Sequence, residues 1–285
     1  MKFVFFGTPD IATIVLDELE LAGFIPSLVV TNPDAQVGRK QILTPSQVKI
    51  WATHRSIPVI TPATLKNPDD LSLITDTNWD LFIVAAYGKL IPAWLIDLPT
   101  HKTLNVHPSL LPKLRGASPI RSAILENIRE TGVTIMQLDA ELDHGPIIAQ
   151  LPANIAPEYW PVAGNILDVG LAHQGGALLA SIIPAWLAGD LTPTPQRHDE
   201  ATFCTKITKD MSQLIIDQIR LPTGHEAYQT LLKIRAFSGW PETFFIHQGK
   251  RIKIKHASLT ADGTLLITRI VPEGKNEMDW DQYFT

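Results

Sequence analysis

Residues 1–21 have the sequence MKFVFFGTPDIATIVLDELEL, and this stretch decides how the fold begins. The β-rich run from Lys2 to Phe6 predicts a buried strand, and Gly7-Thr8-Pro9 is typical of a turn. Beyond the turn, apolar residues recur at helical spacing, at Ile11, Ile14, Val15, Leu16, Leu19 and Leu21. A strand, a turn and a helix in this order indicate the start of an α/β sheet.

Three more apolar runs predict strands over residues 25–30, 81–86 and 103–106. Because these runs are continuous and alternate with helical segments, they indicate parallel strands that are covered on both faces. A turn-forming cluster, Thr31-Asn32-Pro33-Asp34, opens a polar loop that is predicted to reach about Ser46. The fold class of the first half is therefore α/β, with a Rossmann-like, open and mostly parallel sheet.

The next segment contains two further predicted strands, over residues 133–138 and 147–151. Between them lies a polar turn at residues 139–145. A long helix is predicted over residues 165–187, with a kink at Pro184, because proline lacks the N–H that a helix interior needs. The first domain is expected to close with this helix.

The Pro-rich segment GDLTPTP, residues 189–195, has the composition of an interdomain linker. We therefore expect a first domain over residues 1–188, a linker over 189–203 and a second domain over 204–285. In the second domain, a helix around residues 228–237 and three short strands are predicted, the strands over residues 243–246, 251–255 and 264–270. This order indicates a small β-barrel.

The composition limits the class of protein. With 285 residues, 45% of them hydrophobic, the chain is long enough for two apolar cores. A single cysteine, Cys204, excludes an intramolecular disulfide and favours a reducing cytoplasm. The apolar run at the start is too short for a signal-peptide core, and no stretch approaches the roughly 20 uninterrupted apolar residues of a membrane span. We expect a soluble, cytoplasmic protein with no membrane partner.

The charge is unevenly distributed along the chain. The formal net charge of −5 argues against attraction of nucleic acid over the whole surface. Residues 204–285 carry 11 Lys and Arg against 9 Asp and Glu, whereas residues 1–203 carry 13 against 20. A polyanion is therefore expected to prefer the C-terminal part or a local basic loop.

Asn105 and His107 lie where the predicted strand 103–106 ends in a loop. Open α/β sheets bind ligands outside the carboxyl ends of their strands, and strand alternation places these two side chains on one side. The turn at residues 139–145 leaves another strand end and carries Asp143. An Asp, a His and an Asn at neighbouring strand ends indicate an acyl-transfer site.

Several motifs together give the chain a specific resemblance. They are FGTPD at 6–10, the loop from Pro33-Asp34 through Gly38-Arg39 to Val48-Lys49, AYG at 86–88, NVHPSLLPKLRGASPI at 105–120, GVTIM at 132–136, LDHG at 142–145, IRAF at 234–237 and WP at 240–241. On these motifs the chain resembles the methionyl-tRNA formyltransferase family, within the 10-formyltetrahydrofolate-dependent formyltransferases. The resemblance covers nearly the whole length.

The resemblance implies that Asn105, His107 and Asp143 form the catalytic set, without a covalent enzyme intermediate or a metal. The Asn105 amide and an N–H of His107 would hydrogen-bond the formyl oxygen as it becomes an oxyanion. His107 or Asp143 would accept the proton that the attacking amine sheds.

The co-substrate implied by the family is 10-formyltetrahydrofolate. The tract expected to contact it is Ser109, Leu110, Leu111 and Pro112. Its pterin ring has an alternating donor and acceptor edge, which main-chain groups bind well. We expect these groups near Ala86, Tyr87 and Gly88 and in the turn from Asp139 to Gly145.

The implied acceptor is methionyl-initiator tRNA, bound by a monomer. The residues expected to face it are Arg39 and Lys40 in the polar loop and Lys253 and Lys255 along a predicted strand. Solvated surface charge remains the alternative for both pairs. Ala35-Gln36 replaces the usual Arg-Pro of the family, which removes one positive charge. The second domain is also shorter than usual, so an abbreviated OB-like barrel is expected.

Two other functions remain open. One is formylation of a small amine, such as an amino sugar nucleotide or glycinamide ribonucleotide, which needs the same chemistry but no tRNA-sized surface. The other is a folate- or RNA-binding module without catalysis. A dinucleotide site is disfavoured because Gly7-Thr8-Pro9 lacks the Gly-x-Gly-x-x-Gly pattern, and the nine histidines show no zinc-ligand spacing.

Overall fold

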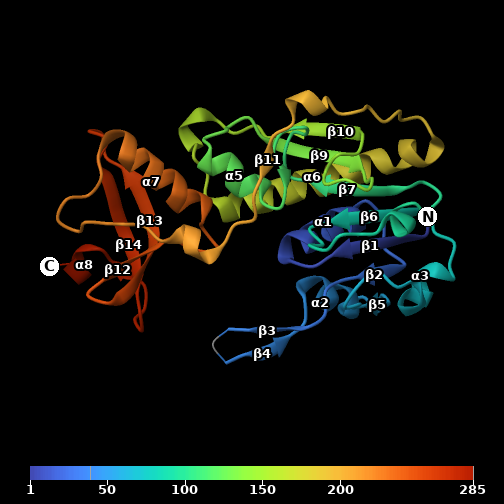
Figure 1. The fold of residues 1–285 in the computed structure, drawn as a ribbon, viewed down its shortest axis with the longest axis horizontal. Helices are drawn as coiled ribbons and strands as arrows, with labels where there is room; N and C mark the ends of the chain where they lie inside the picture. The colour runs from blue at the N-terminus through green and yellow to red at the C-terminus, as the bar shows by residue number, and fades with distance from the viewer. Residues whose placement is uncertain (39, 285) are drawn as a thin grey trace. The chain divides into compact units, whose positions relative to one another are not determined.

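The computed structural model describes residues 1–38 and 40–284, and its first compact unit is built on a seven-stranded sheet (Figure 1). In spatial order the strands are β10 (Ile147–Pro152), β9 (Gly132–Gln137), β7 (Thr103–His107), β6 (Leu81–Ala85), β1 (Phe3–Gly7), β2 (Leu28–Val30) and β5 (Val59–Ile60). The five strands from β5 to β7 are parallel, whereas β9 and β10 are antiparallel to their neighbours. The prediction of an open, mostly parallel α/β sheet is confirmed.

Alternate residues of β1 contribute to different apolar cores on the two faces of this sheet. Phe3 and Phe5 pack with residues of the helices α1 (Asp10–Leu21), α2 (Gln47–His54) and α6 (Gly164–Ala188). Val4 and Phe6 pack with residues of the short helices η1 (Pro68–Leu71), α3 (Ser72–Thr75) and α4 (Ala93–Ile96). A strand buried on both faces must be apolar at every position, which explains the continuous run.

The carboxyl ends of β1, β6 and β7 lie at one edge of the sheet. β1 pairs with β2 on one side and with β6 on the other, so the strand order reverses direction at this point. Open α/β sheets bind ligands at such a switch point. Val84 of β6 pairs with Asn105 of β7, so the loops after these two strands begin side by side.

Helix α6 continues through Pro184, where a kink was predicted. Its 25 residues are long and apolar enough to cross a membrane by length and composition alone. However, Leu179, Ile183 and Trp186 are buried in the core with β-strand residues, and such burial explains an apolar composition in a globular protein. The absence of a membrane partner stays a prediction.

The segment predicted as a polar loop before Ser46 is instead a β-hairpin. β3 (Ala35–Val37) pairs with β4 (Ile42–Thr44) in a two-stranded antiparallel sheet. The loop prediction was wrong because hairpin pairing satisfies backbone groups without burying side chains, so Val37, Ile42 and Leu43 remain exposed. Lys40 lies exposed between the strands, and Arg39 lies outside the described residues.

The second compact unit contains a four-stranded antiparallel sheet. Its strands are β12 (Phe244–His247), β13 (Lys250–Leu259), β14 (Leu265–Pro272) and β15 (Met278–Asp279). Helix α7 (Gly224–Ala236) packs on β13 and β14 and also on helix α5 (Pro119–Leu125). The antiparallel strands are consistent with the predicted small barrel domain.

The compact units are not continuous in sequence. The second unit combines residues 117–130 and 154–168 with the C-terminal part from residue 204. That residues 1–188 and 204–285 form two separate domains therefore stays a prediction. The remaining short elements are β8 (Arg115–Gly116), η2 (Pro157–Tyr159), η3 (His198–Glu200), β11 (Phe203–Cys204), η4 (Lys209–Ser212) and α8 (Asp281–Phe284).

Candidate active site

Strand β7 positions the first two candidate catalytic residues. Asn105 and His107 are two residues apart on this strand and therefore share one face. Their side chains are almost enclosed, since Asn105 is 9% and His107 4% exposed. Within the described residues, no group hydrogen-bonds the side-chain amide of Asn105, which leaves its N–H groups available to a bound molecule.

The imidazole of His107 is oriented by two neighbours. Its Nε2 lies 3.1 Å from the Leu114 carbonyl oxygen, and because a carbonyl only accepts, Nε2 carries the hydrogen. Its Nδ1 lies 3.6 Å from Oδ1 of Asp143, longer than a normal hydrogen bond. The structure therefore brings His107 and Asp143 together across a gap, while the Nε2–H group already has a partner.

Asp143 reaches this position from the turn between β9 and β10. Its backbone adopts a φ of +49°, a left-handed conformation that Asp tolerates better than most residues. The amide N–H of Gly116 donates to its Oδ2 at 2.8 Å, so the carboxylate is fixed while Oδ1 faces His107. A distant part of the sequence thus brings Asp143 to the end of the strand that carries Asn105 and His107.

The tract from Ser109 to Pro112 follows β7 and is bound to β9. Thr134 donates to the Ser109 carbonyl at 2.7 Å and accepts from the Leu111 N–H at 3.1 Å. The Ser109 hydroxyl donates to the Lys113 carbonyl at 2.6 Å. Ser109 and Leu111 are buried, whereas Leu110 and Pro112 are partly exposed and are the members of the tract that a ligand can reach.

Sequence comparison identifies the family to which this site belongs. The family described as formyl transferase matches residues 1–163, which include β7, the tract after it and the Asp143 turn. The chain belongs to the formyltransferase family. This confirms the resemblance on which the catalytic set was predicted.

Relatives and solved structures extend the comparison over the whole chain. The methionyl-tRNA formyltransferase of Halalkalibacterium halodurans is 39% identical over 254 residues, covering 89% of this chain and 77% of that protein. The one from Bacillus mycoides is 35% identical over 307 residues, covering 99% and 95%. In fold, the chain resembles a 4-N formyltransferase from Francisella tularensis with a TM-score of 0.66, at 22% identity and covering 90% and 97%. It also resembles the methionyl-tRNA formyltransferase from Clostridium thermocellum, with a TM-score of 0.59, at 15% identity and covering 98% and 100%.

The backbone of this formyltransferase bends sharply after β6. Ala86 and Gly88 have φ values of +49° and +79°. The Tyr87 carbonyl accepts hydrogen bonds from the Thr8 hydroxyl at 3.2 Å and from the Asn32 amide at 3.3 Å. The Tyr87 ring is buried against Phe6, and burial raises the pKa of its hydroxyl to about 12. Because its side chain is buried, Tyr87 can contact a ligand only through its main chain.

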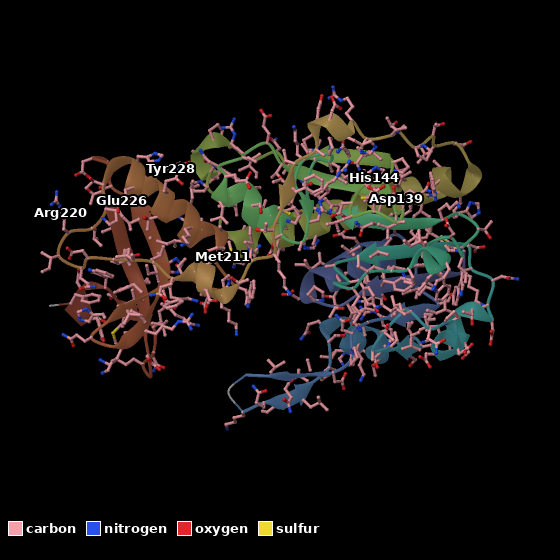
Figure 2. All side chains as sticks on the ribbon, viewed as in Figure 1. Asp139, His144, Met211, Arg220, Glu226 and Tyr228 are labelled. Carbon is pink, nitrogen blue, oxygen red and sulfur yellow. The ribbon has the colours of Figure 1, made fainter. Side chains whose placement is uncertain are left out.

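The turn that carries Asp143 is closed by an internal hydrogen bond between two side chains. His144 Nδ1 lies 2.6 Å from Oδ2 of Asp139, and Figure 2 shows these two residues beside one another. Gly145 ends the turn where no side chain fits, because an added Cβ would overlap the Gln137 carbonyl oxygen. The predicted pterin-binding residues Asp139 and Gly145 thus shape the turn that positions Asp143.

We expect Gly145→Ala to displace this turn. A methyl group at this point overlaps backbone rather than a flexible side chain, so a loss of about 1–3 kcal/mol of stability and a lower kcat are expected. Thermal unfolding and formylation rates measure both effects. The matched control is Gly170→Ala on α6, where an added Cβ meets nothing within 4 Å and helix propensity favours alanine. Equal stabilities of the two variants would contradict the close approach.

The basic residues predicted to contact tRNA have different surroundings. Lys40 is exposed on the hairpin loop. Lys253 and Lys255, two residues apart on β13, both form ion pairs with Glu242. Burial alone would raise the pKa of the Glu242 carboxyl, but hydrogen bonds from Lys253 and Lys255 outweigh burial and hold that pKa below its usual value. The positive charge of this pair is therefore partly compensated.

Two buried polar residues near Asp143 were not predicted as site residues from the sequence. Gln196 and the side chain of Arg115 form a hydrogen-bonded network with the Asp143 turn. Arg115 lies within a motif, but no pattern around Gln196 distinguishes it from a linker residue. Among residues 1–38 and 40–284 no three His, Cys, Asp or Glu side chains are arranged to hold a metal ion.

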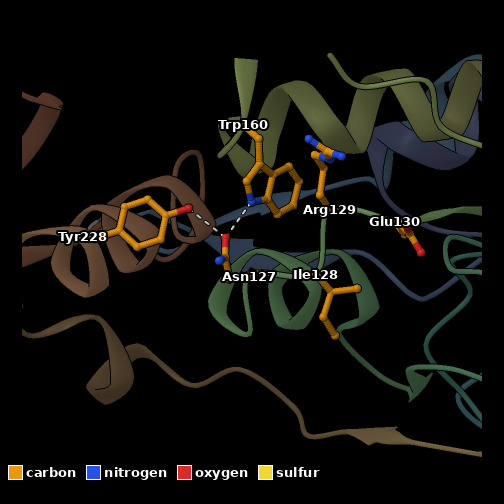
Figure 3. A pocket seen from close by; sticks show the side chains of 6 residues that line it. All are labelled: Asn127, Ile128, Arg129, Glu130, Trp160 and Tyr228. Carbon is orange, nitrogen blue, oxygen red and sulfur yellow. Dashed lines mark hydrogen bonds between the residues drawn. The ribbon is translucent and has the colours of Figure 1, made fainter. Parts of the chain in front are cut away.

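A separate pocket of about 450 Å³ lies within the second unit (Figure 3). The oxygen of the Asn127 amide accepts hydrogen bonds from Trp160 and Tyr228, each at 2.8 Å. Ile128, Arg129 and Glu130 complete its lining, so none of the predicted site residues belongs to this pocket.

Proposed function

We propose that the protein transfers the formyl group of 10-formyltetrahydrofolate to the amino group of methionyl-tRNA. The observation that supports the proposal is the buried approach of His107 to Asp143 at the end of strand β7, which also carries the buried Asn105, in a chain of the formyltransferase family. The relative from Bacillus mycoides, which aligns over 99% of this chain, is named methionyl-tRNA formyltransferase, and this supports the choice of acceptor.

Asn105 supplies the electrostatic part of the chemistry. When the amine attacks, negative charge develops on the formyl oxygen, and the unpaired amide N–H groups of Asn105 can donate to it. His107 was also expected to donate, but its Nε2–H group is directed to the Leu114 carbonyl. The larger share of oxyanion stabilisation is therefore assigned to Asn105.

His107 and Asp143 together accept the proton that the amine sheds. Nδ1 of His107 and Oδ1 of Asp143 face one another across 3.6 Å, and both atoms can accept a proton. A proton released there meets an acceptor on either side, directly or through one water. Because the two groups face one another, we assign proton transfer to the pair.

The folate co-substrate is proposed to lie along the edge formed by the loops after β6, β7 and β9. The partly exposed Leu110 and Pro112 provide apolar contacts. Gly88, where an added Cβ would meet nothing within 4 Å, and the backbone around Ala86 offer main-chain groups for the pterin. Ser109, Leu111 and the ring of Tyr87 act as the buried framework of this surface.

The second candidate acceptor is a small amine, such as an amino sugar nucleotide. It is favoured by the loss of one positive charge at Ala35-Gln36 and by the ion pairs that engage Lys253 and Lys255. The proposal is tested by measuring kcat/KM for transfer of radiolabelled formyl groups to charged initiator methionyl-tRNA and to amino sugar nucleotides. Faster transfer to tRNA supports the proposal. Transfer to the sugar alone would retain the chemistry and overturn the acceptor.

We propose that Arg39, Lys40, Lys253 and Lys255 contact the tRNA, and the Glu242→Gln variant tests the second pair. Loss of this carboxylate leaves the charges of Lys253 and Lys255 uncompensated. Because phosphate binding strengthens with positive charge, the KM for methionyl-tRNA is expected to fall about threefold to tenfold at low salt. The KM for folate should not change. Glu277→Gln, which removes a partner of Arg269, is the control, and an unchanged KM for tRNA in Glu242→Gln would contradict contacts by these lysines.

We also place the protein in the cytoplasm, as the single cysteine Cys204 indicates a reducing compartment. A monomer is proposed as the active form, and its molar mass in solution tests this directly.

A further inference from the structure

Gln196 lies in the segment after α6 and contacts the backbone of the Asp143 turn at two points. Its Nε2 donates to the Asp143 carbonyl at 2.9 Å and to the Gly145 carbonyl at 2.7 Å. The residue is only 5% exposed, so these hydrogen bonds are shielded from water. One side-chain amide thus binds two carbonyl groups of the turn that carries the Asp143 carboxylate.

The orientation of this amide follows from its partners. Its Oε1 accepts from Arg115, at 3.1 Å from Nε and 2.7 Å from Nη2. A guanidinium only donates and a carbonyl only accepts, so the oxygen must face Arg115 and the nitrogen must face the turn. A flipped amide would lose all four hydrogen bonds at once.

Arg115 is itself buried, and its segment holds Asp143 a second time. The N–H of the next residue, Gly116, donates to Oδ2 of Asp143 at 2.8 Å. Residues 115–116 therefore hold Asp143 in two ways. Arg115 orients Gln196, which binds the backbone of Asp143, and the Gly116 N–H binds its carboxylate. Nη2 of Arg115 also lies 2.9 Å from Nδ1 of His198, whose ring stacks on His144 of the same turn.

Asp143 needs such support because its φ of +49° is unfavourable for a residue with a side chain. Left-handed residues persist where the surroundings determine the backbone. Without Gln196, the carbonyl groups of Asp143 and Gly145 would lose the hydrogen bonds that its amide donates. Because an unsatisfied buried carbonyl is unfavourable, the turn would relax toward other conformations.

We propose that Gln196, oriented by Arg115, is a positioning residue that holds the Asp143 carboxylate against His107 for formyl transfer. Among the described residues, the hydrogen bonds of Gln196 go to Arg115 and to the Asp143 turn and not to His107 or Asn105, so it acts through the turn. The inference rests on the proposed function, because it assigns Asp143 a part in the chemistry.

The test compares Gln196→Glu and Gln196→Met with the parent protein. Glutamate keeps an oxygen that accepts from Arg115 but has no N–H to donate to the turn. Methionine has a side chain of similar length but neither the amide oxygen nor the amide N–H. We expect kcat to fall about tenfold to a hundredfold in both variants, as for a small misplacement of a catalytic group. The KM values for folate and tRNA should stay within about twofold. Gln218→Glu, where the glutamine donates to the Ile216 carbonyl, is the control for the same substitution elsewhere.

Two further measurements separate positioning from loss of structure and from failure of the proposed function. In an Asp143→Ala background, Gln196→Met should cause no additional loss of kcat, because its effect passes through Asp143. Hydrogen exchange of residues 139–145 should be faster in both Gln196 variants, whatever the acceptor. Unchanged exchange, or an unchanged kcat, would overturn the inference. A parent protein that does not formylate methionyl-tRNA would overturn the proposed acceptor, and the exchange result would still decide whether Gln196 holds the turn.

Discussion

The Asn105→Ala variant is expected to lose about 100- to 1,000-fold in kcat, with little change in KM for either substrate. Removal of one preformed oxyanion donor typically raises the barrier by about 2.7–4 kcal/mol. The effect should fall in this range because Asn105 has no other hydrogen-bond partner among the described residues and because the His107 Nε2–H group is directed to Leu114. Initial rates of formyl transfer to methionyl-tRNA measure it.

The fold should survive this substitution, since within the described part of the chain Asn105 makes no side-chain hydrogen bond that holds β7 in place. Circular dichroism and thermal unfolding verify this. Asn78→Ala, at an exposed position before β6, is the matched control and should retain full activity. A kcat within threefold of the parent would remove Asn105 from the catalytic set.

The Asp143→Asn variant is expected to lose about 100- to 10,000-fold in kcat, the range for a group that takes part in proton transfer. Asparagine keeps the shape and can still accept from the Gly116 N–H, so the turn should remain closed. What disappears is the negative charge opposite Nδ1 of His107. Folate binding should be retained, which equilibrium titration can establish.

Asp97→Asn provides the control, because Asp97 is an exposed carboxylate paired with Lys102 on the surface. Retained turnover in Asp143→Asn would show that His107 alone accepts the proton. Retained folate binding with abolished turnover would exclude a folate-binding module without catalysis.

These two predictions differ in how far the structure was needed to make them. Asn105 and His107 share a strand, so their common face follows from alternation within three residues of sequence. Asp143 is 36 positions beyond His107, and its approach to within 3.6 Å depends on the pairing of β9 with β7. Family resemblance named Asp143, whereas the tertiary structure supplied the distance and the partner of each carboxylate oxygen.

Other features depended on contacts that no local pattern records. The hairpin β3–β4 was predicted as a loop because its few apolar residues do not alternate in a way that marks a buried face. Lys253 and Lys255 were predicted to face tRNA or solvent, and only the fold brings Glu242 into contact with both of them. The segment with Gln196 was predicted as linker, yet folding buries this residue against the Asp143 turn.

The sequence by itself determined the α/β class, the parallel strands of the first unit and the family, and its motifs supplied the catalytic residues proposed above. Each of these follows from apolar periodicity or from contiguous motifs, in which neighbouring residues constrain one another directly. Tertiary structure alone decided which nitrogen of His107 is free, what compensates the basic pair on β13 and how Gln196 and Arg115 hold Asp143. Such contacts join residues that are distant in sequence, and their geometry is decided only when the intervening strands and helices pack.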